Sequence, residues 1–214
     1  MFDKHYAKYY DLFNREKPYK EEIDLVYKLA DKPEWIFDIG PGTAVYWKYY
    51  PKKVKLFGVD RSPAMIEMAD KSRGQIVCAD IRDYAHNGKF ECVTALFDVI
   101  NYIPRHDWWG NLPLETGGYF LFDIWDKEKV DKDGFKKTVK VVDGATRTIT
   151  LVSYENGKVT FELKIEDKET ILKEMHWMYL YSQDDIKGFC GDSYEISDIV
   201  KTKSWQSWYK LKRK

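Results

Sequence analysis

The sequence predicts an α/β fold built on a mostly parallel sheet, and three observations support this prediction. Between residues 35 and 125, short apolar runs alternate with stretches whose apolar residues have helical spacing. Strands that alternate with helices favour βαβ units with right-handed crossovers. After residue 135 the pattern changes to strand-like stretches separated by tight-turn dipeptides. The length of 214 residues suits one domain, so we expect a single domain over residues 1–214.

The elements of the parallel sheet are expected in order along the chain. Two helices, Tyr6–Phe13 and Tyr19–Ala30, precede the first strand, and Pro18 suits the first turn of the second helix. Five short apolar runs are expected to form the parallel strands: Trp35–Ile39, Val54–Val59, Gln75–Ala79, Phe90–Phe97 and Tyr119–Ile124.

An antiparallel insertion is expected after the fifth strand, over approximately residues 136–181. Its stretches are rich in Val, Thr and Ile, and Asp143-Gly144 and Asn156-Gly157 between them are typical of tight hairpins. We expect this patch to cover the mouth of a site as a lid, with a contact between two subunits as the alternative. The expected strands are Lys136–Val142, Thr146–Tyr154, Lys158–Asp167 and Glu169–Tyr181.

The C-terminal part is expected to return to the main sheet. A short helix at Asp184–Phe189 is followed by two strand-like stretches, Tyr194–Val200 and Ser204–Leu211. We expect these two strands to form an antiparallel hairpin.

Composition excludes several classes of protein. The chain has 35 Lys and Arg and 35 Asp and Glu, so it lacks the basic excess of a duplex-DNA binder. No apolar run approaches the roughly 20 residues of a membrane span, and the N-terminus is too polar for a signal peptide. Three cysteines far apart favour a reducing compartment. Together with the charge balance and the lack of a long apolar run, they predict a cytoplasmic protein without nucleic-acid or membrane partners. Four scattered histidines supply no metal cluster.

A glycine-rich turn is expected at the end of the first strand. The strand contains Asp38, the chain turns through Gly40 and Gly42, and a helix-compatible segment begins near Ala44. Glycines let the backbone approach a ligand closely. Asp60, at the end of the next strand, stands where a carboxylate binds ribose hydroxyls in nucleotide-binding sheets.

The turn favours an adenosine ligand without a phosphate group. A dinucleotide fingerprint requires a third glycine where Val45 stands, and a phosphate-binding loop requires a Gly-Lys-Ser/Thr sequence that is absent. Val45 therefore argues against a nicotinamide-dependent oxidoreductase.

Five motifs in register resemble the class I S-adenosylmethionine-dependent methyltransferases, which have a Rossmann-like sheet. Ala44 replaces the last glycine of the family's first motif, and Glu115-Thr116 departs from the usual proline before the fifth strand. The motifs are Asp38-Ile-Gly-Pro-Gly-Thr-Ala44, Gly58-Val-Asp60-Arg-Ser-Pro-Ala-Met65, Cys78-Ala-Asp80-Ile-Arg-Asp-Tyr84, Phe90-Glu-Cys-Val-Thr-Ala-Leu-Phe-Asp98 and Gly117-Gly118.

The resemblance implies S-adenosylmethionine as cofactor, S-adenosylhomocysteine as product and no metal. The acidic residue of the second motif would bind the ribose, and residues of the second and third motifs would flank the adenine. The cofactor-binding residues that it implies are Tyr10, Tyr19, Asp38, Gly40, Gly42, Asp60, Arg61, Met65, Asp80, Ile81 and Phe97.

A closer resemblance covers nearly the whole chain. The N-terminal Tyr-x-x-Tyr-Tyr-Asp-Leu, the β insertion and Glu174-x-His176 are similar to small-molecule N-methyltransferases that act on nucleotide-linked amino sugars. The resemblance implies a sugar amine or sugar hydroxyl as acceptor. The exposed antiparallel insertion leaves a monomer or a homodimer as the expected states. The alternatives are a methyltransferase for another small amine or acid, and a non-catalytic adenosyl-binding scaffold.

Three residues are candidates for catalysis. Methyl transfer from a sulfonium needs no protein nucleophile, but a hydroxyl or ammonium acceptor must lose a proton. Asp98 follows the fourth strand and could take that proton or could be a helix cap, and His176 could take it or could be structural. Tyr10 could face the sulfonium through its ring, or could belong to ordinary helix packing.

Overall fold

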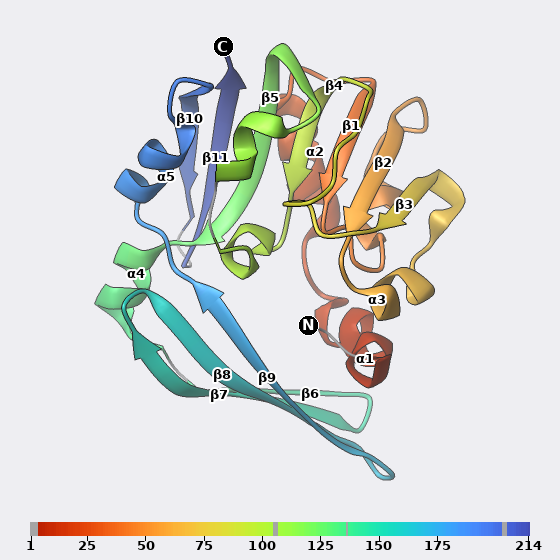
Figure 1. Cartoon of the computed structure of the whole chain (residues 1–214). Helices are drawn as coiled ribbons and strands as arrows, with labels where there is room; N and C mark the ends of the chain where they lie inside the picture. The colour runs from red at the N-terminus through yellow and green to blue at the C-terminus, as the bar shows by residue number, and fades with distance from the viewer. Residues whose placement is uncertain (1–3, 105–106, 136, 203–204) are drawn as a thin grey trace.

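A seven-stranded sheet forms the centre of the protein (Figure 1), in a computed structural model that describes residues 4–104, 107–135, 137–202 and 205–214. The strand order is β10-β11-β5-β4-β1-β2-β3, and β11 is antiparallel to both of its neighbours while β1 to β5 are parallel. This topology confirms the predicted parallel sheet with a C-terminal hairpin. The strands are β1 (Trp35–Ile39), β2 (Lys55–Asp60), β3 (Gly74–Cys78), β4 (Phe90–Ala95), β5 (Leu114–Trp125), β10 (Tyr194–Lys201) and β11 (Gln206–Arg213).

A second, antiparallel sheet has the order β6-β7-β8-β9 and accounts for the predicted insertion. Its hairpin turns contain Asp143-Gly144 and Asn156-Gly157, and all four residues have positive φ angles, as primed hairpin turns require. Figure 1 shows this sheet across the carboxyl ends of the main strands. Lys136 and Ser204, the first residues of two predicted strands, lie outside the described residues. The strands are β6 (Thr138–Val142), β7 (Ala145–Glu155), β8 (Lys158–Glu166) and β9 (Ile171–Tyr179).

The helices are short and partly differ from the expectation. The helix expected after the glycine turn is wrong, because residues Val45–Tyr49 form a 3₁₀-helix, η1. This segment buries Tyr46 and Trp47, and Pro51 soon after it stops further helical hydrogen bonding. The helices are α1 (Lys4–Asn14), α2 (Tyr19–Leu29), α3 (Pro63–Met68), α4 (Lys127–Asp133) and α5 (Gln183–Cys190), and the other 3₁₀-helices are η2 (Lys71–Arg73), η3 (Val99–Tyr102) and η4 (Asp107–Asn111).

Alternate residues of the central strands pack on opposite faces of the main sheet. Phe37 and Val93 belong to one buried cluster, whereas Ile36 and Cys92 belong to another on the opposite face. A third cluster joins α1 to the inner face of the second sheet, with Tyr6 and Phe13 packed near Leu163 and Ile165. The second sheet is therefore fixed to the N-terminal helix as well as to the main sheet.

Asn101 joins the two sheets by hydrogen bonds. Its side chain is 0% exposed, its Nδ2 donates to the carbonyl oxygen of Tyr179 at 2.6 Å, and its Oδ1 accepts from the backbone N–H of Trp125 at 2.8 Å. Tyr179 ends β9 and Trp125 ends β5. One side chain in η3 thus holds the end of the second sheet beside the end of a central strand.

No helix within the described ranges is long and apolar enough to cross a membrane.

Several large apolar side chains of the second sheet are exposed. The expectation of a monomer or homodimer stays a prediction. The exposed apolar residues are Val139, Val141, Val152, Ile171, Met175 and Trp177.

We predict that Asn101→Ala lowers the free energy of unfolding by about 2–4 kcal/mol. The substitution removes the partner of a partly buried N–H and of a partly buried carbonyl, and an unpaired group of this kind costs about 1–3 kcal/mol when buried. Chemical denaturation of both proteins measures the difference, with Asn87→Ala at an exposed position as the matched control. A loss no larger than that of the control would contradict the role given to Asn101.

Candidate active site

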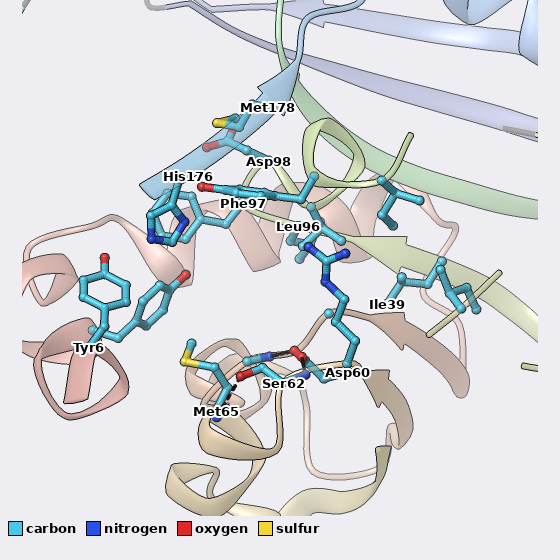
Figure 2. A pocket seen from close by; sticks show the side chains of 18 of the residues that line it. Tyr6, Ile39, Asp60, Ser62, Met65, Leu96, Phe97, Asp98, His176 and Met178 are labelled. Atoms are coloured by element: carbon cyan, nitrogen blue, oxygen red, sulfur yellow. Dashed lines mark hydrogen bonds between the residues drawn. The ribbon is translucent and has the colours of Figure 1, made fainter. Parts of the chain in front are cut away.

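A cavity of about 260 Å³ lies between the glycine turn and the second sheet. Figure 2 shows Asp60, Ser62 and Met65 at one end of this cavity, and His176, Asp98 and Met178 at the other. The first group and Asp98 come from the main sheet and the segments that follow its strands, whereas His176 and Met178 come from β9 of the insertion, so the cavity combines both parts of the fold. The predicted site residues that line it are Tyr10, Gly40, Gly42, Asp60, Arg61, Met65, Asp80, Ile81, Phe97, Asp98 and His176.

Asp60 holds the glycine turn in place. Its Oδ2 accepts from the N–H of Gly42 at 2.9 Å, and its Oδ1 accepts from the N–H of Ser62 at 2.8 Å. Burial raises the pKa of this carboxyl above its ordinary value. Gly40 has a φ angle of +67°, and a Cβ there would lie 2.8 Å from Cγ2 of Val99. The backbone therefore passes where a side chain would not fit.

Asp38 does not line the cavity, and its predicted contact with the cofactor stays a prediction. Its Oδ2 accepts from the indole Nε1 of Trp47 at 2.7 Å, and its Oδ1 accepts from the hydroxyl of Thr94 at 2.7 Å. It is 3% exposed, and burial raises its pKa to about 6 against the lowering effect of these two bonds. Asp38 thus joins β1, β4 and η1 behind the glycine turn.

Of the two tyrosines predicted to bind the cofactor, only one lines the cavity. Tyr19 does not line the cavity, since it packs edge-on against Tyr46 at 4.9 Å and stacks with Tyr49 at 6.1 Å between ring centroids. Tyr10 does line the cavity, with its ring 6.1 Å from that of Phe97 and 5.9 Å from that of Tyr6. Helix α1 therefore supplies an aromatic wall to the site.

The third predicted motif lies along another wall. Asp80 forms a double hydrogen bond with Arg82, from Nε at 2.9 Å and from Nη2 at 2.6 Å. This pairing lowers the pKa of Asp80 below its usual value. Apolar side chains complete the wall, among them Ile39, Val59, Met65 and Ile81.

Phe97 and Asp98 form a strained turn after β4. Both have left-handed φ angles, 68° and 62°, although neither is glycine. Their backbone N–H groups donate to Oδ1 and Oδ2 of Asp123 at 2.6 and 3.1 Å. Asp98 precedes η3, but its side chain makes no capping hydrogen bond, so the alternative of a helix cap gains no support.

The protonation of Asp98 differs from the expectation of an ordinary aspartate base. Burial, followed by the charge of Asp123, raises the pKa of Asp98 well above its usual range. Burial and the charge of Asp123 therefore favour the protonated form of Asp98.

His176 lies on the inner face of β9 and is 2% exposed. Its Nε2 is 2.8 Å from Oε2 of Glu174, and its ring stacks on Phe161 at 5.4 Å with an angle of 12°. The carboxylate fixes the orientation of the ring. Across the described ranges, no group of three or more His, Cys, Asp or Glu side chains could hold a metal ion.

Arg147 lines the cavity, and the sequence reasoning missed it. It comes from β7, and its Nη1 donates to Oδ1 of Asn14 at 3.3 Å. The signal was present, since Ala145, Arg147 and Ile149 alternate on one side of a predicted strand. A charged side chain in such an apolar row either reaches solvent at the edge of the sheet or binds a polar ligand. Tyr102 and Met178 also line the cavity without a comparable signal.

Residues 36–112 match the family model described as a methyltransferase domain. This region of the chain is a methyltransferase domain. The match covers the first four motifs and confirms the class of enzyme expected from them. No curated protein sequence matches the chain significantly.

Solved structures extend the likeness in fold to the whole chain. An S-adenosylmethionine-dependent methyltransferase from Clostridium acetobutylicum has a TM-score of 0.79 at 20% identity, covering 98% of each chain. DesVI from Streptomyces venezuelae has a TM-score of 0.79 at 21% identity, covering 100% of each chain. CalS10 from Micromonospora echinaspora, an amino pentose methyltransferase, has a TM-score of 0.77 at 17% identity, covering 100% of this chain and 98% of that one. The likeness establishes the Rossmann-like methyltransferase fold, including the second sheet.

We predict that Asp38→Asn flattens the dependence of stability on pH. In the folded protein Asp38 keeps its proton up to pH about 6, whereas the ordinary value is 3.8. Its contribution to the free energy of unfolding is thus fully present below the ordinary pKa and lost as the pH rises through 6, by about 3 kcal/mol. Denaturant unfolding between pH 4 and 8 measures this slope, and Asp192→Asn, at an exposed position, is the control. Equal slopes in all three proteins would contradict the burial argument.

Proposed function

We propose that the chain transfers a methyl group from S-adenosylmethionine to a small polar acceptor, a sugar amine or a sugar hydroxyl. The observation that carries the proposal is one cavity that joins the glycine turn and Asp60 to Asp98 and His176. One end suits an adenosine ligand, and the other supplies polar groups for an acceptor. The amino pentose methyltransferase among the similar structures supports the class of acceptor.

The residues at the glycine turn fit this cofactor. Asp60 uses one acceptor position on each oxygen for backbone N–H groups, and each carboxylate oxygen can accept a further bond from a ribose hydroxyl. Met65 and Ile81 would enclose the adenine, and Asp80 would face its amino group. Because Gly42 lacks a side chain, the cofactor would approach the backbone there.

The cofactor supplies an electrophilic methyl group on a sulfonium cation, and the chain supplies position and shielding. The rings of Tyr10 and Phe97 would present their faces to the cation and keep water out. Alignment of the acceptor is the main requirement, because no protein nucleophile takes part. His176, oriented by Glu174, would take the proton that the acceptor loses.

Ligand binding and turnover test the proposal together. Isothermal titration with S-adenosylmethionine, S-adenosylhomocysteine and NAD should give binding of the first two only. Mass spectrometry should then detect methyl transfer to a member of a panel of nucleotide-linked amino sugars and their hydroxyl counterparts. Binding of NAD alone would refute the proposal, and cofactor binding without turnover on any sugar, amine or acid would favour the scaffold alternative.

We predict that Asp60→Ala weakens binding of S-adenosylmethionine tenfold or more. The substitution removes two charge-assisted hydrogen bonds to the ribose, each worth about 1.5–3 kcal/mol. Calorimetry measures the affinity, circular dichroism checks the fold, and Asp83→Ala at an exposed position is the matched control. Unchanged affinity would place the ribose elsewhere.

We predict that His176→Ala lowers turnover by about 10²–10⁴-fold, the usual contribution of a general base, while cofactor affinity stays nearly constant. The residue lies at the end of the cavity remote from Asp60 (Figure 2). Steady-state kinetics with a verified acceptor measures the change. His86→Ala is the control, because His86 packs between Phe57 and Phe90 away from the cavity. If His176→Ala retained full turnover, alignment alone would account for catalysis.

A further inference from the structure

A second cavity, of about 410 Å³, adjoins the candidate active site. It shares Phe97, Asp98 and Trp125 with the first cavity, and its volume is in the range of sites for small molecules. Among the described residues, neither the glycine turn nor the second sheet contributes to its lining, so it continues the site away from the cofactor end. The lining residues are Lys17, Glu22, Phe97, Asp98, Trp125, Asp133, Trp205 and Gln206.

An aromatic group forms one wall of this second cavity. The rings of Trp125 and Trp205 are 5.4 Å apart between centroids, and Phe135 packs against them at 5.8 and 5.5 Å. The backbone carbonyl of Trp205 accepts from the N–H of Asp126 at 2.9 Å, which ties this residue to the end of β5. Trp205 is only half-buried, so part of its apolar surface is open to a ligand.

The charged groups of the second cavity leave no unpaired cation for a phosphate group. Lys17 is the one cation among the described lining residues, and its Nζ is bound to Glu22 and to the hydroxyl of Tyr46, the latter at 2.6 Å. Asp133, at the end of α4, is exposed and adds a negative charge. The net charge of the described lining is therefore negative, whether or not Asp98 carries a proton.

Two further cations near the site also fail to serve the second cavity. Lys129 does not line it, and its Nζ donates to the backbone carbonyls of Thr202 and Gln206 at 3.1 and 2.8 Å. Arg147 lines only the first cavity, where it is bound to Asn14 of α1. A phosphate group in the second cavity would thus meet carboxylates, and burying a charge that has no partner costs free energy.

We propose that the second cavity binds the part of the acceptor that is not methylated, and that this part is an uncharged sugar ring. A pyranose ring has a face of C–H groups that packs against an aromatic ring, and hydroxyls at its edge that donate to a carboxylate. Trp205 supplies the first contact and Asp133 the second. The inference rests on the proposed function and narrows its acceptor to a glycoside that carries no phosphate.

The shared residues allow one acceptor to occupy both cavities. A ring that lies against Trp205 would direct the next sugar toward Phe97 and Asp98, where the two cavities meet. The first cavity continues from there to Tyr10 and to the cofactor end. Binding of the remote ring would thus help to align the reacting sugar, which is the main requirement of methyl transfer.

Three acceptors that carry the same terminal amino sugar test the inference on the wild-type protein. They are its methyl glycoside, a disaccharide in which it is joined to an uncharged second sugar, and its nucleoside diphosphate ester. The disaccharide should exceed both others in kcat/KM by about tenfold or more, because only the disaccharide fills the second cavity with an uncharged ring. The three hydroxyl counterparts are assayed alongside, so the result does not depend on which atom is methylated.

The comparison separates this inference from the proposed function. A preference for the nucleoside diphosphate ester, or equal kcat/KM for the disaccharide and the methyl glycoside, would overturn the inference and leave the proposed methyl transfer intact. Binding of S-adenosylmethionine without transfer to any of the six compounds would overturn both.

Two variants assign the effect to the second cavity. Trp205→Ala should raise KM for the disaccharide about tenfold or more and leave KM for the methyl glycoside nearly constant, because it removes the surface against which the second ring packs. Trp35→Ala is the matched control, since Trp35 is 53% exposed at the start of β1 and lines neither cavity. Asp133→Lys should raise kcat/KM for the nucleoside diphosphate ester about fivefold relative to the disaccharide, because it supplies a cation. Asp192→Lys makes the same change of charge outside both cavities and should have no such effect.

A binding measurement gives a readout without turnover. Calorimetry of the disaccharide with protein saturated in S-adenosylhomocysteine should show an affinity about tenfold lower in Trp205→Ala than in Trp35→Ala. Equal affinities would overturn the inference. Should Trp205→Ala fail to fold, the exposed Asp133 still tests it, because an acceptor preference in Asp133→Lys equal to that in Asp192→Lys would also overturn it.

Discussion

Buried carboxylates that accept backbone and side-chain donors hold the loops on which the site depends. Asp60 fixes Gly42 and Ser62, and Asp123 fixes Phe97 and Asp98. A buried charge is costly unless donors satisfy it, so each carboxylate restricts the loop beside it to conformations that supply N–H groups. The loops after β1, β2 and β4 are short and carry little regular helix. Their shape comes from these local bonds more than from packed crossover helices.

The second sheet completes a site that the main sheet leaves open. Parallel strands gather their carboxyl ends at one edge, where ligands of α/β proteins bind. Here β7, β8 and β9 place Arg147, Phe161 and His176 opposite that edge, in one cavity with Asp60. Asn101 and the packing of α1 hold the sheet in this position. The insertion therefore contributes side chains to the site as well as cover, as its predicted role as a lid requires.

Most of the fold could be predicted from the spacing of apolar residues and from the residues at the turns. The site could be predicted only in part. β1 begins and ends where the apolar run Trp35–Ile39 does, and the turns at Asp143-Gly144 and Asn156-Gly157 have the conformation that these dipeptides favour. The bonds of Asp38 could not be predicted, because the motif does not reveal that Trp47, nine residues later, turns back to bind it. Burial and then the charge of Asp123, which is 25 residues away in the sequence and on another strand, raise the pKa of Asp98. Contacts of this range follow from strand order, which local patterns do not specify.

The turn after β4 shows why a methyltransferase would accept strain at this place. A non-glycine residue in the left-handed region costs about 1–2 kcal/mol, and two in succession are uncommon. Glycines at these positions would remove that cost, but they would also remove the ring of Phe97 and the carboxyl of Asp98 from the cavity. The two bonds to Asp123 offset part of the strain and fix the direction of both side chains. Because methyl transfer depends on alignment, a rigid turn that fixes two side chains in the cavity is worth more to this site than an unstrained one.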